Sequence, residues 1–201
     1  MRYVRPSSEA EMIAQFLQQE HAHPERYGIT LGAALRTEGV SPDRLSDPDI
    51  ADQVANAERR RVLAHYRGYG AGRPSYLTDF PDRGVDWQWV ALTPHEVLDS
   101  RYIRYAYWTD LSAGTRSPRV AADRIRRGEV EGTSFLPLAE RLRDGLVIPP
   151  LILVSADDGA TRVILEGHAR ITAYALAPKT IPDEVEVILG TSPEIARWDE
   201  Y

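Results

Sequence analysis

The chain has 201 residues, 43% of them hydrophobic, and a formal net charge of −6 from 24 Lys and Arg against 30 Asp and Glu. This size and apolar content predict a globular protein of one domain, or one domain with an appendage. The lack of cysteine excludes disulfides, thiolate catalysis and Cys-ligated metal, and the negative charge disfavours broad binding to nucleic acid. No apolar run is long enough to span a bilayer and the start does not resemble a signal peptide, so we expect a cytoplasmic protein with no membrane segment.

The first third of the chain has a helical pattern. Met12, Ile13, Phe16 and Leu17 recur at spacings of three and four, and Asp47-Pro48 is a start signal for a later helix. The Gly- and Pro-rich stretch over 67–84 predicts a connector. We therefore expect a helical N-terminal extension over 1–80, with a possible role in binding a protein partner or in self-association, and a second domain over 85–201.

Strands and helices alternate in the second domain, which predicts an α+β fold. The strands are expected at 86–92, 102–111 and 183–190, with a hairpin formed by 148–155 and 161–166. Helices are expected at 93–98, where Thr93, Pro94 and Glu96 form a capping pattern, and at 117–128, 135–145, 168–176 and 192–198. The spacing places seven apolar residues in one core: Leu138, Leu142, Leu151, Leu153, Val163, Leu165 and Ile171.

The corner between the strand ending at Glu166 and the following helix is the main candidate site. Gly167 lets the backbone bend and approach a ligand, and the first N–H groups of the helix, at His168, Ala169 and Arg170, face that point. Arg170 adds a charged fork suited to phosphate. The alternative from the residues alone is an exposed i,i+4 ion pair between Glu166 and Arg170, with His168 as a solvated cap residue.

The order of elements and the segment Glu166-Gly167-His168-Ala169-Arg170 resemble the ParB/sulfiredoxin-like fold over residues 86–190. The equivalent corner reads Gly-Cys-His-Arg in sulfiredoxin, Gly-Glu-Arg-Arg in ParB proteins and Asp-Gly-His-His-Arg in the related free-serine kinases. The resemblance implies that Gly167, His168 and Arg170 hold nucleotide phosphates. His168 stands where sulfiredoxin has its reactive cysteine, and only one of the paired arginines of ParB is present, so the kinase version is the most similar.

The resemblance implies a phosphotransferase that uses ATP or ADP with Mg²⁺ and acts on a small hydroxylated metabolite. Glu166 would orient Mg²⁺ or accept a proton, His168 would lie at the reacting phosphate, and Glu131, or else Glu129, would match a catalytic glutamate that precedes a helix in the kinases. Two other functions stay open: a ParB-like regulator that binds a nucleotide or a partner without turnover, and a ParB-like nuclease, which the net charge disfavours.

A second polar loop, 111–119, also precedes a helix. Thr115 and Arg116 are its candidate nucleotide-binding residues, because backbone donors and a guanidinium are placed together there. The alternative is a capped loop whose arginines face solvent. The sequence identifies neither the acceptor nor the base of the nucleotide.

Overall fold

The computed structural model of the chain describes residues 1–70 and 75–201. It contains two compact units: Ser7–Trp87, called here the helical unit, and Met1–Pro6 with Gln88–Tyr201, called here the sheet unit. The expected boundary, between residues 80 and 85, lies a few residues before the observed division between Trp87 and Gln88. The expected connector includes residues 71–74, which lie outside the described residues.

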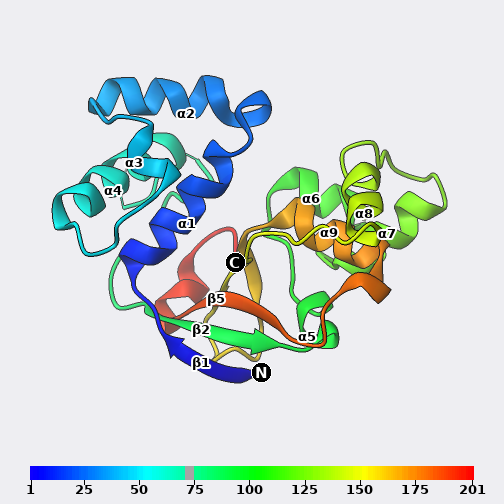
Figure 1. Cartoon of the computed structure of the whole chain (residues 1–201). Coiled ribbons are helices and arrows are strands. Elements are labelled where there is room, and N and C mark those ends of the chain that lie inside the picture. The colour runs from blue at the N-terminus through cyan, green and yellow to red at the C-terminus, as the bar shows by residue number, and fades with distance from the viewer. Residues whose placement is uncertain (71–74) are drawn as a thin grey trace. The chain divides into compact units, whose positions relative to one another are not determined.

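The helical unit consists of α1 (Glu9–His21), α2 (Pro24–Glu38), α3 (Asp43–Ser46) and α4 (Gln53–Arg67), shown in blue and cyan in Figure 1. The expected stripe on α1 is buried, including Met12 and Phe16. The expected start of the last helix at Asp47-Pro48 was wrong. Asp47 closes the short helix α3, and α4 begins after Asp52, whose side chain accepts a hydrogen bond from the Ala55 N–H at 3.0 Å.

The sheet unit contains a five-stranded sheet in the order β1-β2-β5-β3-β4. Its strands are β1 (Arg2–Pro6), β2 (Asp86–Leu92), β3 (Ile152–Ser155), β4 (Val163–Glu166) and β5 (Val185–Thr191). β1 pairs antiparallel with β2, β3 pairs antiparallel with β4 as expected for the hairpin, and β3 runs parallel to β5. The sequence did not predict β1, because it is an edge strand without a buried face and shows no apolar alternation.

The remaining described helices also belong to the sheet unit: α5 (Pro94–Leu98), α6 (Ala106–Leu111), α7 (Pro118–Arg126), α8 (Leu136–Arg143), α9 (His168–Leu176) and the 3₁₀ turns η1 (Pro178–Thr180) and η2 (Pro193–Arg197). α9 packs against α5, α7 and α8 (Figure 1). The capping box of α5 is confirmed: Thr93 accepts from the Glu96 N–H, and the Glu96 carboxylate accepts from the Thr93 N–H at 2.8 Å. The fold is therefore of the α+β class, as expected.

Two details of the sheet unit differ from the predictions. The segment expected as a strand over 102–111 contains α6, since Tyr102 and Ile103 are buried while Tyr105 and Tyr107 are 53% and 49% exposed and so do not share a buried face. Of the seven expected core residues, Leu138 is half-buried, and Val163 and Leu165 are buried but lie outside the main cluster, to which Ile164 between them belongs. The alternation of β4 explains this, because neighbouring residues point to opposite faces of a sheet.

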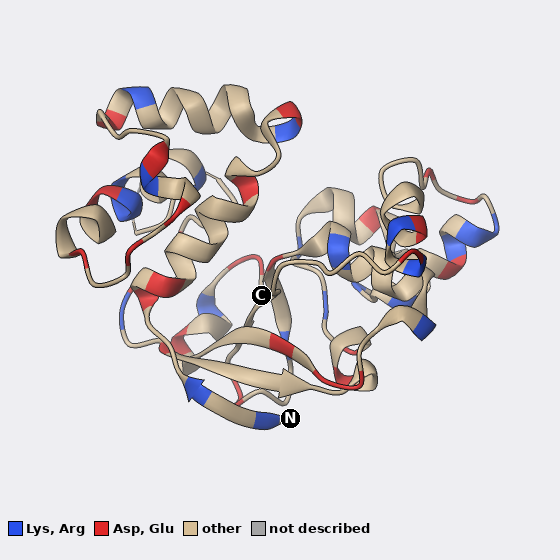
Figure 2. Cartoon of the chain, in the orientation of Figure 1, with Lys and Arg blue, Asp and Glu red and all other residues tan. Residues whose placement is uncertain are grey.

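Both units carry Lys and Arg as well as Asp and Glu on their helices (Figure 2). Over the described residues, no helix is both long enough and apolar enough to cross a membrane.

Candidate functional site

Gly167 joins β4 to α9 with a φ of 113°, a conformation that favours glycine. A Cβ placed on it would lie 2.4 Å from Cδ2 of Leu151 and 3.2 Å from Nη2 of Arg170. The bend was expected, but the close approach is to side chains of the same unit. Packing inside the protein therefore already requires glycine here.

Arg170 is largely buried and bonded within the protein. Its Nη1 donates to the carbonyl oxygens of Pro149 and Pro150 at 2.8 and 2.7 Å, and its Nη2 donates to Oε1 of Glu166 at 2.9 Å. The side chains of Arg170 and Glu166 are 11% and 16% exposed. The i,i+4 pair of the alternative reading is therefore present, but it is largely buried rather than exposed, and the guanidinium is engaged by groups of the protein itself. It ties the corner to the segment before β3.

His168, the first residue of α9, lies in a cluster of aromatic rings. Its ring centroid is 4.8 Å from that of Trp108 and 6.1 Å from that of Tyr102. Only 7% of the residue is exposed, and burial, with a smaller effect from Arg170, lowers the pKa of its imidazole to about 3. His168 is therefore neutral at pH 7 and not the solvated cap residue of the alternative reading. Its buried Nε2 has no hydrogen-bond partner among the described residues.

The buried imidazole of His168 should make stability depend on pH. The unfolded chain protonates it near its ordinary pKa of 6.5, whereas the folded protein does so only near 3, so stability is lost as the pH falls between these values. We expect urea unfolding to give a steeper loss between pH 7 and pH 5 for the wild type than for His168→Phe, which keeps a ring. His23→Gln, at an exposed histidine, controls for the loss of one imidazole. Equal slopes for the wild type and His168→Phe would contradict the prediction.

No side chain caps the N-terminus of α9. The first intrahelical bond runs from the Ile171 N–H to the Gly167 carbonyl, so the N–H groups of His168, Ala169 and Arg170 have no acceptor within the helix. Ala169 is half-buried. These donors and the helix dipole favour a negative charge beside His168.

The second candidate loop is linked to this corner through Tyr102. Nε of Arg116 donates to the Tyr102 carbonyl at 2.7 Å, and Nη1 donates to the Tyr201 carbonyl at 2.7 Å. Burial, together with Arg104 and Arg101 nearby, lowers the pKa of Arg116 to about 10, and its buried Nη2 has no partner within the described chain. Thr115 donates to the Ser112 carbonyl at 2.7 Å. Thr115 and Arg116 thus mainly fix the loop, and Arg116 retains one unused donor group.

Two of the candidate acids, Glu129 and Glu131, lie on the loop between α7 and α8, whereas Glu166 ends β4. Glu131 is exposed, and its carboxylate accepts a hydrogen bond from the Thr133 hydroxyl at 2.9 Å. Glu129 is paired with Arg124 and Arg127, and its pKa is lowered mainly by the hydrogen bond from Arg127. The loop that carries both acids leads to Phe135, whose ring is 6.0 Å from Trp108. Of these two acids, Glu131 is the one not held by an arginine.

Within residues 1–70 and 75–201, no group of three or more His, Asp or Glu side chains is placed to hold a metal ion. Glu166 presents one carboxylate, and its Oε1 is already bonded to Arg170. Mg²⁺ commonly binds through one or two carboxylates together with phosphates and water. These residues therefore fit Mg²⁺ only as part of a metal–nucleotide complex, not as a separate protein site.

The sequence did not identify Trp108, Pro149 and Pro150 as part of the corner. Trp108 is half-buried and its ring stacks on that of His168. The Pro149-Pro150 pair was the available sequence signal for the contacts of Arg170. Prolines have no N–H to donate in a strand ladder, but their carbonyls can still accept hydrogen bonds from a side chain.

Comparisons with known proteins assign no family. No family model matches the chain, and no solved structure matches it. The virion host shutoff proteins of Human herpesvirus 2 strains 333, G and HG52 are each 28% identical over 145 residues, which is 71% of this chain. The match spans 25% of the length of those relatives.

Proposed function

We propose that the sheet unit is a nucleotide-binding domain of the ParB/sulfiredoxin-like kind, and that it transfers a phosphoryl group from ATP or ADP to a small hydroxylated metabolite. The observation that carries the proposal is the N-terminus of α9, which has no side-chain cap and begins with the buried, neutral His168 whose Nε2 has no partner in the described chain. Such a helix end binds phosphate through its N–H groups.

In this proposal the N–H groups of His168, Ala169 and Arg170 contact the phosphate oxygens, and a neutral His168 adds one hydrogen bond. Arg170 acts by positioning, since its bonds to Glu166, Pro149 and Pro150 hold the first turn of α9 in place. Mg²⁺ would accompany the nucleotide and neutralise charge on the phosphates. Arg116, with its unused Nη2, contributes positive charge next to Tyr102.

The acceptor hydroxyl would attack the terminal phosphorus of the nucleotide, the bond to the leaving phosphate would break, and the hydroxyl proton would pass to a carboxylate. Glu131 suits this role better than Glu166, because Oε1 of Glu166 already accepts a hydrogen bond from Arg170, whereas no arginine is bonded to Glu131 among the described residues.

A regulator that binds nucleotide without turnover is the second candidate. The same corner favours a regulator, because its one carboxylate, that of Glu166, is paired with Arg170 and is not available to accept a proton from a substrate. Turnover of ATP or ADP with a panel of hydroxylated metabolites separates the two functions. Under the kinase proposal Glu131→Gln binds nucleotide but loses turnover; a wild type that binds and never turns over supports the regulator.

The binding test uses a substitution that favours the helix but repels phosphate. Ala169→Asp places a carboxylate at the second position of α9, where the helix dipole stabilises it by about 0.3 to 1 kcal/mol. We expect calorimetry with ATP, ADP and CTP in Mg²⁺ to show at least about a tenfold loss of affinity. Because Ala169 packs against the core, a cooperative thermal melt is the check that the variant still folds.

The matched control is Val54→Asp, at the second position of α4 and exposed, which should leave nucleotide binding unchanged. A wild type that binds none of the three nucleotides at millimolar concentration overturns the proposal. So does an Ala169→Asp variant that binds as tightly as the wild type.

A further inference from the structure

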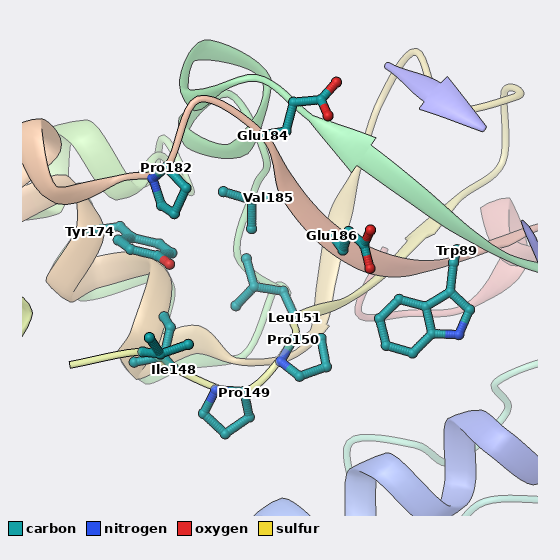
Figure 3. Close-up of a pocket in the computed structure, with 11 residues that line it drawn as sticks. Trp89, Ile148, Pro149, Pro150, Leu151, Tyr174, Pro182, Glu184, Val185 and Glu186 are labelled. Atoms are coloured by element: carbon teal, nitrogen blue, oxygen red, sulfur yellow. The ribbon is translucent and has the colours of Figure 1, made fainter. Parts of the chain in front are cut away.

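A pocket of about 290 Å³ lies in the sheet unit and is lined in part by Pro149 and Pro150, whose carbonyls accept hydrogen bonds from Arg170. Figure 3 shows its walls: Trp89 from β2, Tyr174 from α9, the two prolines, Glu184 from the residue before β5 and Glu186 from β5. A volume of this size is close to that of small-molecule sites.

The pocket walls are mostly apolar and fixed in position. Trp89 and Tyr174 are buried to more than nine-tenths. The proline wall is held by the two hydrogen bonds from Arg170, at 2.8 and 2.7 Å, so the pocket is formed before any ligand arrives. Preformed apolar walls reduce the entropic cost of binding.

The two carboxylates of the pocket differ in their surroundings. Glu184 is bonded to Arg2, with Nη2 to Oε2 at 2.6 Å. Glu186 makes no hydrogen bond or ion pair among the described residues and interacts with Arg2 only through its charge at longer range, and its side chain lies between Val185 and Trp89 in Figure 3. An unpaired carboxylate next to an aromatic ring attracts an organic cation through both the charge and the ring.

We infer that this pocket binds a basic group carried on a hydrocarbon stem, a guanidinium or alkylammonium, with the charge at Glu186 and the stem against the prolines and Tyr174. Trp89 already accepts such a contact, because Cζ of Arg5 lies 4.8 Å from the ring centroid and Arg5 does not line the pocket. The two acids exclude a phosphate ligand. The pocket is therefore separate in chemistry from the helix end at His168, and its test does not depend on nucleotide binding.

The test compares butylguanidinium with butylurea, which has a similar shape and no charge, by NMR titration of the full chain. A second pair, the acetylated and amidated peptide Gly-Arg-Gly and its citrulline analogue, distinguishes a protein side chain from a free small molecule as the source of the group. We expect each charged probe to shift the amide signals of Val185 and Glu186, and its neutral analogue to shift them much less.

Glu186→Gln should weaken binding of the charged probe at least about tenfold. Glu140→Gln, at an exposed acid of α8 that does not line the pocket, is the matched control and should bind as the wild type does. The inference is overturned if charged and neutral probes bind equally, if Glu186→Gln binds like the wild type, or if no probe shifts these signals at millimolar concentration.

Discussion

Arg170→Ala should lower the free energy of unfolding by about 3 to 5 kcal/mol, the usual cost of removing one partner of a buried ion pair. The substitution leaves the Glu166 carboxylate, 16% exposed, without its cation, and leaves the Pro149 and Pro150 carbonyls without their donor. An exposed i,i+4 pair would cost only about 0.3 to 0.5 kcal/mol. Urea unfolding of the wild type and the variant distinguishes these values.

Two further variants test the cause of this loss. Arg170→Lys keeps the charge but not the fork that reaches both carbonyls and the carboxylate, so it should recover only part of the stability. Arg170→Met with Glu166→Leu removes both charges and should be more stable than Arg170→Ala. If Arg170→Ala lowers the free energy of unfolding by less than about 1 kcal/mol, solvent can replace these contacts. Arg170 would then be available to bind a ligand.

The elements predicted correctly depend on short-range rules. The Thr93 capping box, the β3–β4 hairpin and α9 are each specified by a few neighbouring residues, and the structure contains all three. β1 depends on pairing with β2, which is distant in the chain, and its own residues carry no apolar pattern. The segment at Tyr105 and Tyr107 was misread because alternating aromatic residues occur in helices and loops as well as in strands.

The candidate corner and its i,i+4 pair of Glu166 and Arg170 could be located from sequence, but the other contacts could not. Gly167 and the start of α9 follow from a local strand–turn–helix pattern. The two carbonyl partners of Arg170 are 20 and 21 residues away in sequence, and the ring partners of His168 lie on another helix and in the segment before it. Spacing rules describe neighbours on one element, so they cannot show which distant carbonyl or ring a side chain will meet.

Gly167→Ala should destabilise the sheet unit by about 2 to 4 kcal/mol, because strain in the backbone and overpacking act together. The φ of 113° is unfavourable for any residue with a Cβ, and the added Cβ would lie 2.4 Å from Cδ2 of Leu151. Leu151 is 1% exposed, so it has little room to move. Thermal and urea unfolding measure the loss.

Gly145→Ala separates the two causes. Gly145 also has a positive φ, 90°, and lies in the same unit, but nothing lies within 4 Å of its Cβ position. Its substitution should therefore cost only the backbone strain, about 1 to 2 kcal/mol. The double variant Gly167→Ala with Leu151→Ala should lose less stability than the sum of the single variants, because removing the leucine side chain relieves the clash. Equal losses for Gly167→Ala and Gly145→Ala, with additive effects in the double variant, would show that contact with Leu151 does not restrict position 167 to glycine.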